Sequence, residues 1–264
     1  MLGTPTSYPE LNHVLAMLVD GARDVLGDRF VGAYLQGSFA VGDADGFSDV
    51  DFIVAMNDGL DGPQVVAIGE LHRRIFTMPA VWAQHLEGSY IPVAALRHVD
   101  TDRTRFAYFD NGSTTLEWSD HDNTAVMRWS LRERGVTLAG PQPATLIDPV
   151  TASVLSAEVI GSLRDRRTFL HDHPAELDNG WVQPYIVLTF CRGLHTIAVG
   201  AVTSKPVAGR WAIDALDDRW APLIRRALED RPDPSARARR PADPDALAET
   251  WAFIDDVVGS LTAV

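Results

Sequence analysis

Two aspartates, Asp49 and Asp51, lie in and beside an apolar run from Val50 to Ala55. Such a run is typical of a buried strand, and strand side chains alternate between faces, so both carboxylates point to the same side. Neighbouring carboxylates repel each other unless a cation compensates them. Hard oxygen ligands suit Mg²⁺, which proteins usually hold with one or two carboxylates together with substrate phosphates. The spacing therefore predicts a magnesium site on this strand.

A small-residue turn, Gly37-Ser38, precedes this strand and follows an earlier apolar run over residues 30–35. Two other phosphate or metal templates fail at this stretch. A P-loop needs Gly-Lys-Ser or Gly-Lys-Thr at its end, which is absent, and an EF-hand begun at Asp43 lacks both its glycine and its final glutamate. The pattern is therefore interpreted as strand, turn, connector and second strand.

The order Gly37-Ser38, a spacer and then Ser48-Asp49-x-Asp51 resembles the signature of the nucleotidyltransferase superfamily that includes DNA polymerase beta. In that superfamily the Gly-Ser backbone and hydroxyl hold nucleotide phosphates, while the two aspartates hold metal. The alternative is a plain solvent-exposed strand with two acidic residues, and the turn at a fixed distance upstream argues against it.

Composition indicates a soluble globular protein. The chain has 264 residues, of which 46% are hydrophobic, and its mean hydropathy is −0.04. This length suits one large or two moderate domains. We expect no membrane partner, because no apolar run approaches a membrane span and the N-terminus lacks the pattern of a signal peptide. The single Cys191 allows no intrachain disulfide, which agrees with the cytoplasmic location that we expect. We also expect a monomer.

The charge of the chain bears on its partners. A formal net charge of −13 argues against a nucleic-acid partner and favours a cationic small-molecule acceptor, although acidity by itself can also serve solubility. Lys205 is the only lysine among 23 basic residues. An ammonium group binds phosphate as a compact point charge, so a phosphate-binding role is one reading, and retention by chance is the other.

Periodicity predicts mixed structure in the first part of the chain. Apolar residues recur every three to four positions over 8–26 and 63–76, as in amphipathic helices that cover a sheet. A further helix is expected over 122–134. Strands are expected at 30–35 and 50–55, and residues 81–93 show strand-like stretches broken at Gly88 and Pro92. Residues 106–109 and 114–118 are expected to be short strands or loop segments, with Asp110-Asn111-Gly112 as the turn between them.

The second part of the chain is expected to be helical. We place the domain boundary between residues 145 and 146, inside a segment interrupted by glycine and prolines. Helices are predicted at 151–171, 184–199, 206–216, 219–229 and 245–261, with a polar loop at 231–244. The expected fold class is α+β. With the superfamily resemblance, we expect a nucleotidyltransferase domain over 1–145, with a mixed sheet and flanking helices, followed by an all-α C-terminal helical bundle over 146–264.

Further short motifs occur in order along nearly the whole chain. Besides those already quoted, they are Leu86-Glu87, Glu117-Trp118, Gly140-Pro141, Asp148-Pro149, Leu188-Thr189 with Arg192, Thr203-x-Lys205 and Trp211-Ala212. Together these motifs are similar to those of the aminoglycoside adenylyltransferases that modify streptomycin and spectinomycin. In that family a nucleotidyltransferase domain precedes a helical bundle, and substrates bind between the two.

The resemblance implies Mg²⁺-dependent transfer of AMP from ATP to a hydroxyl of an aminoglycoside or aminocyclitol antibiotic such as spectinomycin or streptomycin. It implies that Glu87, on a strand beside that of the aspartates, is the general base and could also contact metal. By itself, a glutamate at a strand end is more often a solvated edge residue. The remaining implied roles are nucleotide binding by Gly37, Ser38, Arg192 and Lys205, and metal binding by Asp49 and Asp51.

The acceptor pocket is implied less directly. Trp118 corresponds to a residue that would line the antibiotic pocket. Asp178 and Trp181 lie near, but out of register with, a Trp and an Asp that contact the drug in streptomycin-modifying members. Two alternatives stay open: a nucleotidyltransferase for another small-molecule or protein hydroxyl, and a silent nucleotide-binding regulator, in which loss of Glu87 or of one aspartate would be expected.

Overall fold

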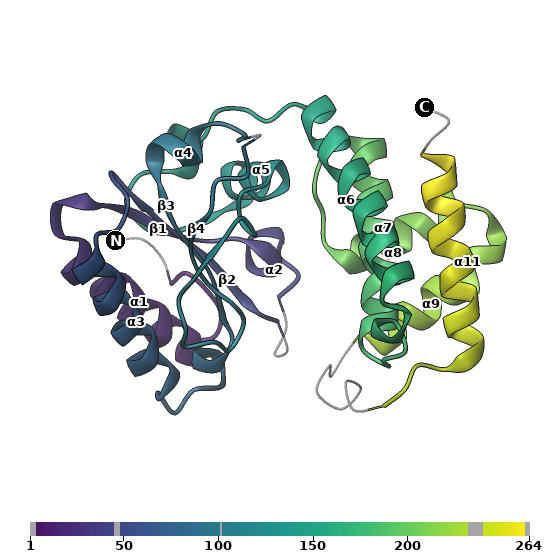
Figure 1. The fold of residues 1–264 in the computed structure, drawn as a ribbon, viewed down its shortest axis with the longest axis horizontal. Coiled ribbons are helices and arrows are strands. Elements are labelled where there is room, and N and C mark those ends of the chain that lie inside the picture. Colours follow the sequence, from purple (N-terminus) through teal and green to yellow (C-terminus); the bar gives the residue numbers. More distant parts are fainter. Residues whose placement is uncertain (1–3, 45–47, 101, 232–239, 262–264) are drawn as a thin grey trace. The chain divides into compact units, whose positions relative to one another are not determined.

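The structure, a computed structural model, describes residues 4–44, 48–100, 102–231 and 240–261. The chain divides into two compact units, Met1–Val150 and Thr151–Val264 (Figure 1). Leu146 and Ile147, which follow the boundary expected from the sequence, pack into the core of the first unit beside Tyr34. Each unit is described by itself.

A six-stranded mixed sheet forms the centre of the first unit. Its strand order is β5-β4-β3-β2-β1-β6. The neighbours β2 and β3 are parallel and every other neighbouring pair is antiparallel, which confirms the expected mixed sheet. The strands are β1 (Phe30–Leu35), β2 (Val50–Met56), β3 (Leu86–Pro92), β4 (Phe106–Phe109), β5 (Glu117–Ser119) and β6 (Val136–Ala139).

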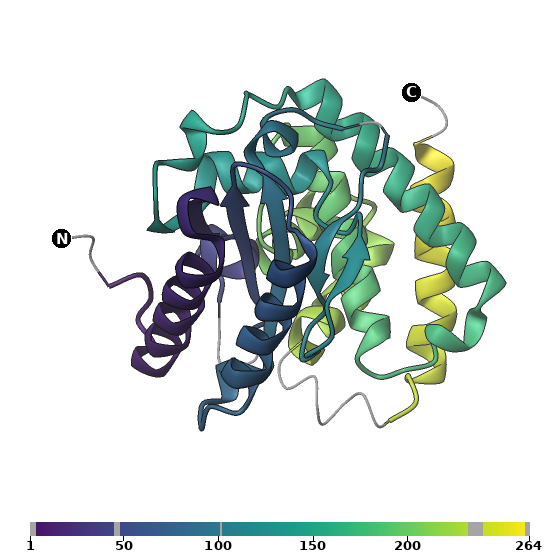
Figure 2. The ribbon, with the colours of Figure 1, turned by 60° about the vertical axis from the view of Figure 1, so that its left-hand side comes forward.

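Helices cover both faces of this sheet (Figures 1 and 2). One face packs on α1 (Pro9–Leu26) and α3 (Gly62–Phe76), and the other on α4 (Val93–Arg97) and α5 (Ala125–Arg134). Side chains of β2 alternate between two cores: Phe52 belongs to the α1/α3 side and Ile53 to the α5 side. Asp51 therefore lies on the α5 side, because it shares the parity of Ile53.

Three local expectations for the first unit were wrong. The Gly-Ser turn is a short helix, α2 (Gly37–Val41), and residues 81–84 form a 3₁₀ turn rather than a strand. Gly88 does not break a strand but lies inside β3, where a Cβ would come within 2.0 Å of the Phe52 carbonyl oxygen. Strand β6 was not expected, because its four residues are too short to show a period.

The second unit is helical in its described residues, as expected. Its helices are α6 (Ala152–Asp172), α7 (Val182–Val199), α8 (Lys205–Ala215), α9 (Ala221–Asp230) and α11 (Pro244–Ser260). Helix α7 contacts all the others and is buried along most of its length. Most of the loop expected at 231–244 lies outside the described residues. None of the described helices has both the length and the hydropathy that crossing a bilayer requires.

Candidate functional site

The Gly-Ser motif places backbone directly against a predicted metal ligand. Gly37 follows β1, has φ = +58°, and would put a Cβ 1.8 Å from Asp51 Oδ2. Only glycine adopts this backbone without steric cost and leaves room for the carboxylate. Ser38 follows on the first turn of α2. Part of the spacer between the motif and β2, residues 45–47, lies outside the described residues.

The acidic residues expected at the metal come from two neighbouring strands. Because β2 and β3 are parallel, with Asp51 opposite Glu87, the two carboxylates occupy equivalent positions on one face of the sheet. This confirms the strand pairing that the resemblance implied. Asp49 lies just before β2, and its Oδ1 accepts a hydrogen bond of 2.5 Å from Asn111 Nδ2.

Glu87 is held by side chains that the sequence did not single out. Its Oε1 lies 2.7 Å from Tyr108 Oη and 3.2 Å from His121 Nε2. The Tyr108 hydroxyl also lies 3.1 Å from Asp110 Oδ1, but it has one proton to donate, and the shorter contact is to Glu87. The rings of Tyr108 and His121 stack at a centroid distance of 5.0 Å. Two polar rings therefore contact the carboxylate proposed as the base.

The acidic surroundings shift the ionisation of both rings. The hydrogen bond to Glu87 raises the pKa of His121 to about 9, with further contributions from Asp122 and Asp51. His121 is therefore protonated at neutral pH. Burial raises the pKa of the Tyr108 hydroxyl, and the nearby Glu87 raises it further, so the phenol stays neutral and can donate.

The residue after His121, Asp122, is a buried carboxylate. It accepts hydrogen bonds from Gln36 Nε2 at 3.0 Å and from Ser89 Oγ at 2.7 Å. Gln36 immediately precedes Gly37, and Ser89 stands two positions after Glu87 on β3. Burial raises the pKa of Asp122. This residue therefore connects the end of β1, the middle of β3 and the segment that carries His121.

The donor set on this face fits a hard divalent cation. Asp51 and Glu87 occupy paired positions on the neighbouring strands β2 and β3, and Asp49 lies immediately before β2. All three side chains offer carboxylate oxygens, which suit such an ion. Within the described residues no three His, Cys, Asp or Glu side chains are already grouped as a metal cage. Mg²⁺ does not require such a cage, since it is commonly bound by one or two carboxylates plus phosphate and water. The assignment of these residues to metal stays a prediction.

The predicted nucleotide-binding cations both lie in the second unit. Arg192 is on α7 and Lys205 is the first residue of α8. The Lys205 ammonium lies 4.1 Å from the centroid of the Tyr185 ring, which in turn stacks on Trp181 at 5.1 Å. A cation over an aromatic face is attracted by the ring quadrupole. The structure thus groups Lys205 with Trp181, which had been expected at the acceptor.

The other two acceptor candidates are placed differently. Trp118, on β5, is 52% exposed, a large amount for a tryptophan. Asp178 Oδ1 accepts a hydrogen bond from the Ala242 backbone N–H at 3.1 Å, which ties the start of α7 to the segment before α11. Asp178 therefore has a structural contact, and its contact with an acceptor stays a prediction.

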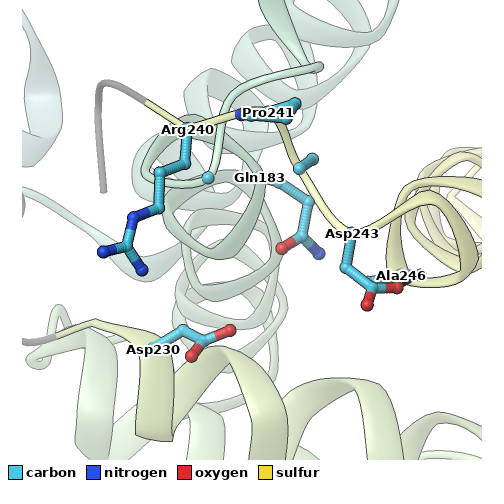
Figure 3. A pocket seen from close by; sticks show the side chains of 8 residues that line it. Gln183, Asp230, Arg240, Pro241, Asp243 and Ala246 are labelled. Carbon is cyan, nitrogen blue, oxygen red and sulfur yellow. Dashed lines mark hydrogen bonds between the residues drawn. The ribbon is translucent and has the colours of Figure 1, made fainter. Parts of the chain in front are cut away.

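A cavity of about 240 Å³ lies in the second unit beside this segment (Figure 3). It contains none of the predicted site residues, although the Ala242 that Asp178 holds is on its wall. Its polar lining combines opposite charges, Arg240 with Asp230 and Asp243. The full lining is Gly180, Gln183, Asp230, Arg240, Pro241, Ala242, Asp243 and Ala246.

Sequence reasoning missed four polar residues of the acidic face. Asn111 was assigned only to a turn, Tyr108 only to a short strand, and Asp122 only to a helix that in fact begins at Ala125. His121 was not considered. The one available signal was composition, because residues 108–123 hold many polar side chains next to strand-like runs.

The chain is similar to known proteins in sequence. Residues 153–252 match the family model for the aminoglycoside adenylyltransferase C-terminal domain. Spectinomycin 9-adenylyltransferase of Staphylococcus aureus is 26% identical over 217 residues, which cover 76% of this chain and 78% of the relative. Aminoglycoside (3'') (9) adenylyltransferase of Klebsiella pneumoniae is 28% identical over 105 residues, or 40% of this chain and 37% of the relative.

The fold agrees with a solved structure. Spectinomycin adenyltransferase from Enterococcus faecialis, whose crystal structure holds ATP and spectinomycin, matches with a TM-score of 0.69 at 15% identity over 96% of this chain and 100% of that one. This likeness concerns the fold, and the relatives named as adenylyltransferases support a nucleotidyltransferase enzyme. The match of residues 153–252 and the similarity to these relatives support the resemblance of this chain to the aminoglycoside adenylyltransferases.

Proposed function

We propose that this protein transfers AMP from ATP to a hydroxyl of a cationic aminocyclitol antibiotic of the spectinomycin type, with Mg²⁺ at its aspartates. One observation carries the proposal: Asp51 and Glu87 occupy opposite register positions on parallel strands, with the Gly37 backbone packed against Asp51. Relatives named for spectinomycin adenylyl transfer support the choice of acceptor.

The reaction needs a base and an anion-binding backbone. A sugar hydroxyl is a poor nucleophile at neutral pH, so Glu87 accepts its proton as oxygen attacks the α-phosphorus and the bond to pyrophosphate breaks. Gly37 and Ser38 bind phosphate oxygens at the end of β1. The positive φ of Gly37 keeps its backbone beside Asp51, so phosphate and metal ligands are adjacent.

Asp49 and Asp51, with Glu87 beside them, are the residues that would hold Mg²⁺. The ion would stabilise charge on the phosphate oxygens during transfer. The hydrogen bond from Asn111 to Asp49 orients that carboxylate, as partners of ligating groups commonly do.

Cations of the second unit complete the proposed set. Arg192 and Lys205 neutralise charge on the triphosphate and on the departing pyrophosphate. The Tyr185 ring under the Lys205 ammonium limits the positions of that flexible side chain. Trp118, Asp178 and Trp181 are the residues assigned to the acceptor.

The charge of the protein suits a cationic acceptor. A net charge of −13 attracts a protonated amine and would slow encounter with an anionic one. Aminocyclitol and aminoglycoside antibiotics carry such amines beside their hydroxyls, so electrostatics and the relatives point to the same class of acceptor.

The test is incubation with ATP, Mg²⁺ and a panel of aminocyclitols and aminoglycosides, with spectinomycin and streptomycin as separate arms. Mass spectrometry should find an added AMP on spectinomycin and release of pyrophosphate. Asp51→Asn serves as the inactive control, because it removes metal-binding charge and hardly alters shape. The proposal fails if the parent protein adenylylates no member of the panel.

A further inference from the structure

Two side chains meet the same oxygen of Glu87. Tyr108, on β4, places its hydroxyl 2.7 Å from Oε1, and His121, which follows β5, places Nε2 at 3.2 Å from the same atom. Their rings stack with an interplanar angle of 23°, so each ring restricts the other. The two donors approach from strands and loops outside β3, which carries Glu87.

We propose that Tyr108 and His121 form a clamp that orients the Glu87 carboxylate toward the acceptor hydroxyl. The inference rests on the proposed role of Glu87 as the base. A glutamate side chain has three rotatable bonds, and fixing them during each turnover would cost conformational entropy. Hydrogen bonds made before the acceptor binds remove that cost, and proton transfer is sensitive to small displacements of the base. Tyr108 and His121 are thus positioning residues.

Hydrogen bonds of the neighbouring residue Asp122 hold the segment that carries His121. The residue after His121 is the buried Asp122, which accepts from Ser89 on β3 and from Gln36 at the end of β1. Ser89 and Glu87 lie on the same face of β3, so the strand that carries the base also binds the segment that carries the clamp. The position of His121 relative to Glu87 is therefore set by buried hydrogen bonds.

A purely structural role makes a different prediction from the clamp. If the Tyr108 hydroxyl and the His121 ring only satisfied polar groups of the fold, removing them would change stability whether or not Glu87 carries a carboxylate. If they act through Glu87, their effect on turnover disappears once that carboxylate is gone. A double-mutant cycle separates these cases.

The experiment measures steady-state kcat and KM for Tyr108→Phe, His121→Ala and the double variant, in the parent protein and in Glu87→Gln. In the parent, each change should lower kcat about 10-fold, the range for losing a hydrogen bond to a charged group, with KM for ATP nearly unchanged. In Glu87→Gln neither change should lower the rate further. His121→Gln, which keeps an N–H donor on a side chain of similar reach, should restore part of the rate.

Tyr90→Phe is the matched control, because it removes a buried tyrosine hydroxyl that is bonded to a histidine, His72, on the opposite face of the sheet. Its kcat should equal that of the parent. Equal losses in the parent and in Glu87→Gln would overturn the clamp, as would an undiminished kcat in the Tyr108→Phe, His121→Ala double variant.

A parent protein that modifies no acceptor would defeat the proposed function, and crystal structures then decide the clamp alone. The parent should show Glu87 Oε1 bonded to Tyr108 and His121, and the double variant should show the carboxylate turned to another rotamer. An unchanged Glu87 rotamer in a folded double variant would overturn the inference.

Discussion

Each face of the sheet has a histidine beside a tyrosine, and the pKa values of the two histidines are shifted in opposite directions. On the α1/α3 face, His72 Nε2 lies 2.9 Å from Tyr90 Oη, and its ring stacks on Phe109 at 3.6 Å. On the α5 face, His121 stacks on Tyr108 and binds Glu87. The pairs contain the same residue types but differ in their neighbours.

Those neighbours decide the charge. Burial among apolar rings lowers the pKa of His72 to about 3, whereas the hydrogen bond to Glu87 raises the pKa of His121 to about 9. At neutral pH the first histidine is neutral and belongs to a core, and the second is a cation in an acidic site. A histidine in this protein therefore takes its role from nearby carboxylates or from their absence.

The largest effect is expected from the carboxylate that distinguishes the two faces. Glu87→Gln should lower the rate of transfer by about 10² to 10⁴, the usual span for a general base, and should leave ATP binding intact. Rapid-quench assays with ATP titrations measure both. The control is Glu70→Gln, which changes an exposed glutamate on α3 and should have no effect on the rate. A collapse of ATP affinity instead would indicate that Glu87 acts mainly as a metal ligand and not as the base.

Next comes the glycine that packs against Asp51. Gly37→Ala forces a Cβ onto the Asp51 carboxylate and should lower transfer by about 10²-fold, as expected for misplaced reacting groups. Gly42→Ala is a matched control, because Gly42 also has positive φ, +73°, but has no atom within 4 Å of the added Cβ. Both variants should lose roughly 1–2 kcal/mol of stability from backbone strain, and only Gly37→Ala should lose activity. If Gly37→Ala and Gly42→Ala were equally active, the position of Asp51 would not matter for transfer.

On the α1/α3 face, the prediction concerns acid stability. The folded pKa of His72 lies below its unfolded value, so its contribution to stability is complete above about pH 6.5 and is lost as pH falls toward 3. By pH 5 this proton-linked loss amounts to about 2 kcal/mol. His72→Gln does not titrate in this range, so denaturant melts at pH 5 and pH 8 should differ less than for the parent. An unchanged pH dependence would show that His72 is not buried and neutral.

The smallest effect is expected from His121, and it has the opposite sign. Its folded pKa is raised, so its contribution is complete below about pH 6.5 and is lost as pH rises through 9. The His121 side chain is 57% exposed, so solvent screening keeps the effect small. In denaturant melts of the metal-free protein, the free energy of unfolding should decrease less steeply between pH 7 and 10 for His121→Gln than for the parent. If the parent instead gained stability over this range, the contrast between the two histidines would fail.

Local patterns in the sequence were sufficient to predict most of the helices and strands. The period of α1 and α3, the apolar runs of β1 and β2, and the helical second unit were all predicted, because a helix or strand buries one face through neighbours a few residues away. The same local rule predicted Asp49 and Asp51 on one side of a strand, but β2 begins at Val50, so only Asp51 lies within it. Where the expectation failed, at Gly88 and at α2, a glycine lies against a residue distant in the sequence: Gly88 against Phe52, and Gly37 against Asp51.

The amino-acid sequence alone was enough to predict the acidic pair, its Gly-Ser neighbour and, through the resemblance, Glu87. The residues that surround them became known from the three-dimensional fold. Asn111 reaches Asp49 from 62 positions away, and Tyr108 and His121 reach Glu87 through strand pairings between β3, β4 and β5. Register and burial are properties of paired strands and packed cores, so no short-range period can encode which tyrosine or histidine will meet a carboxylate.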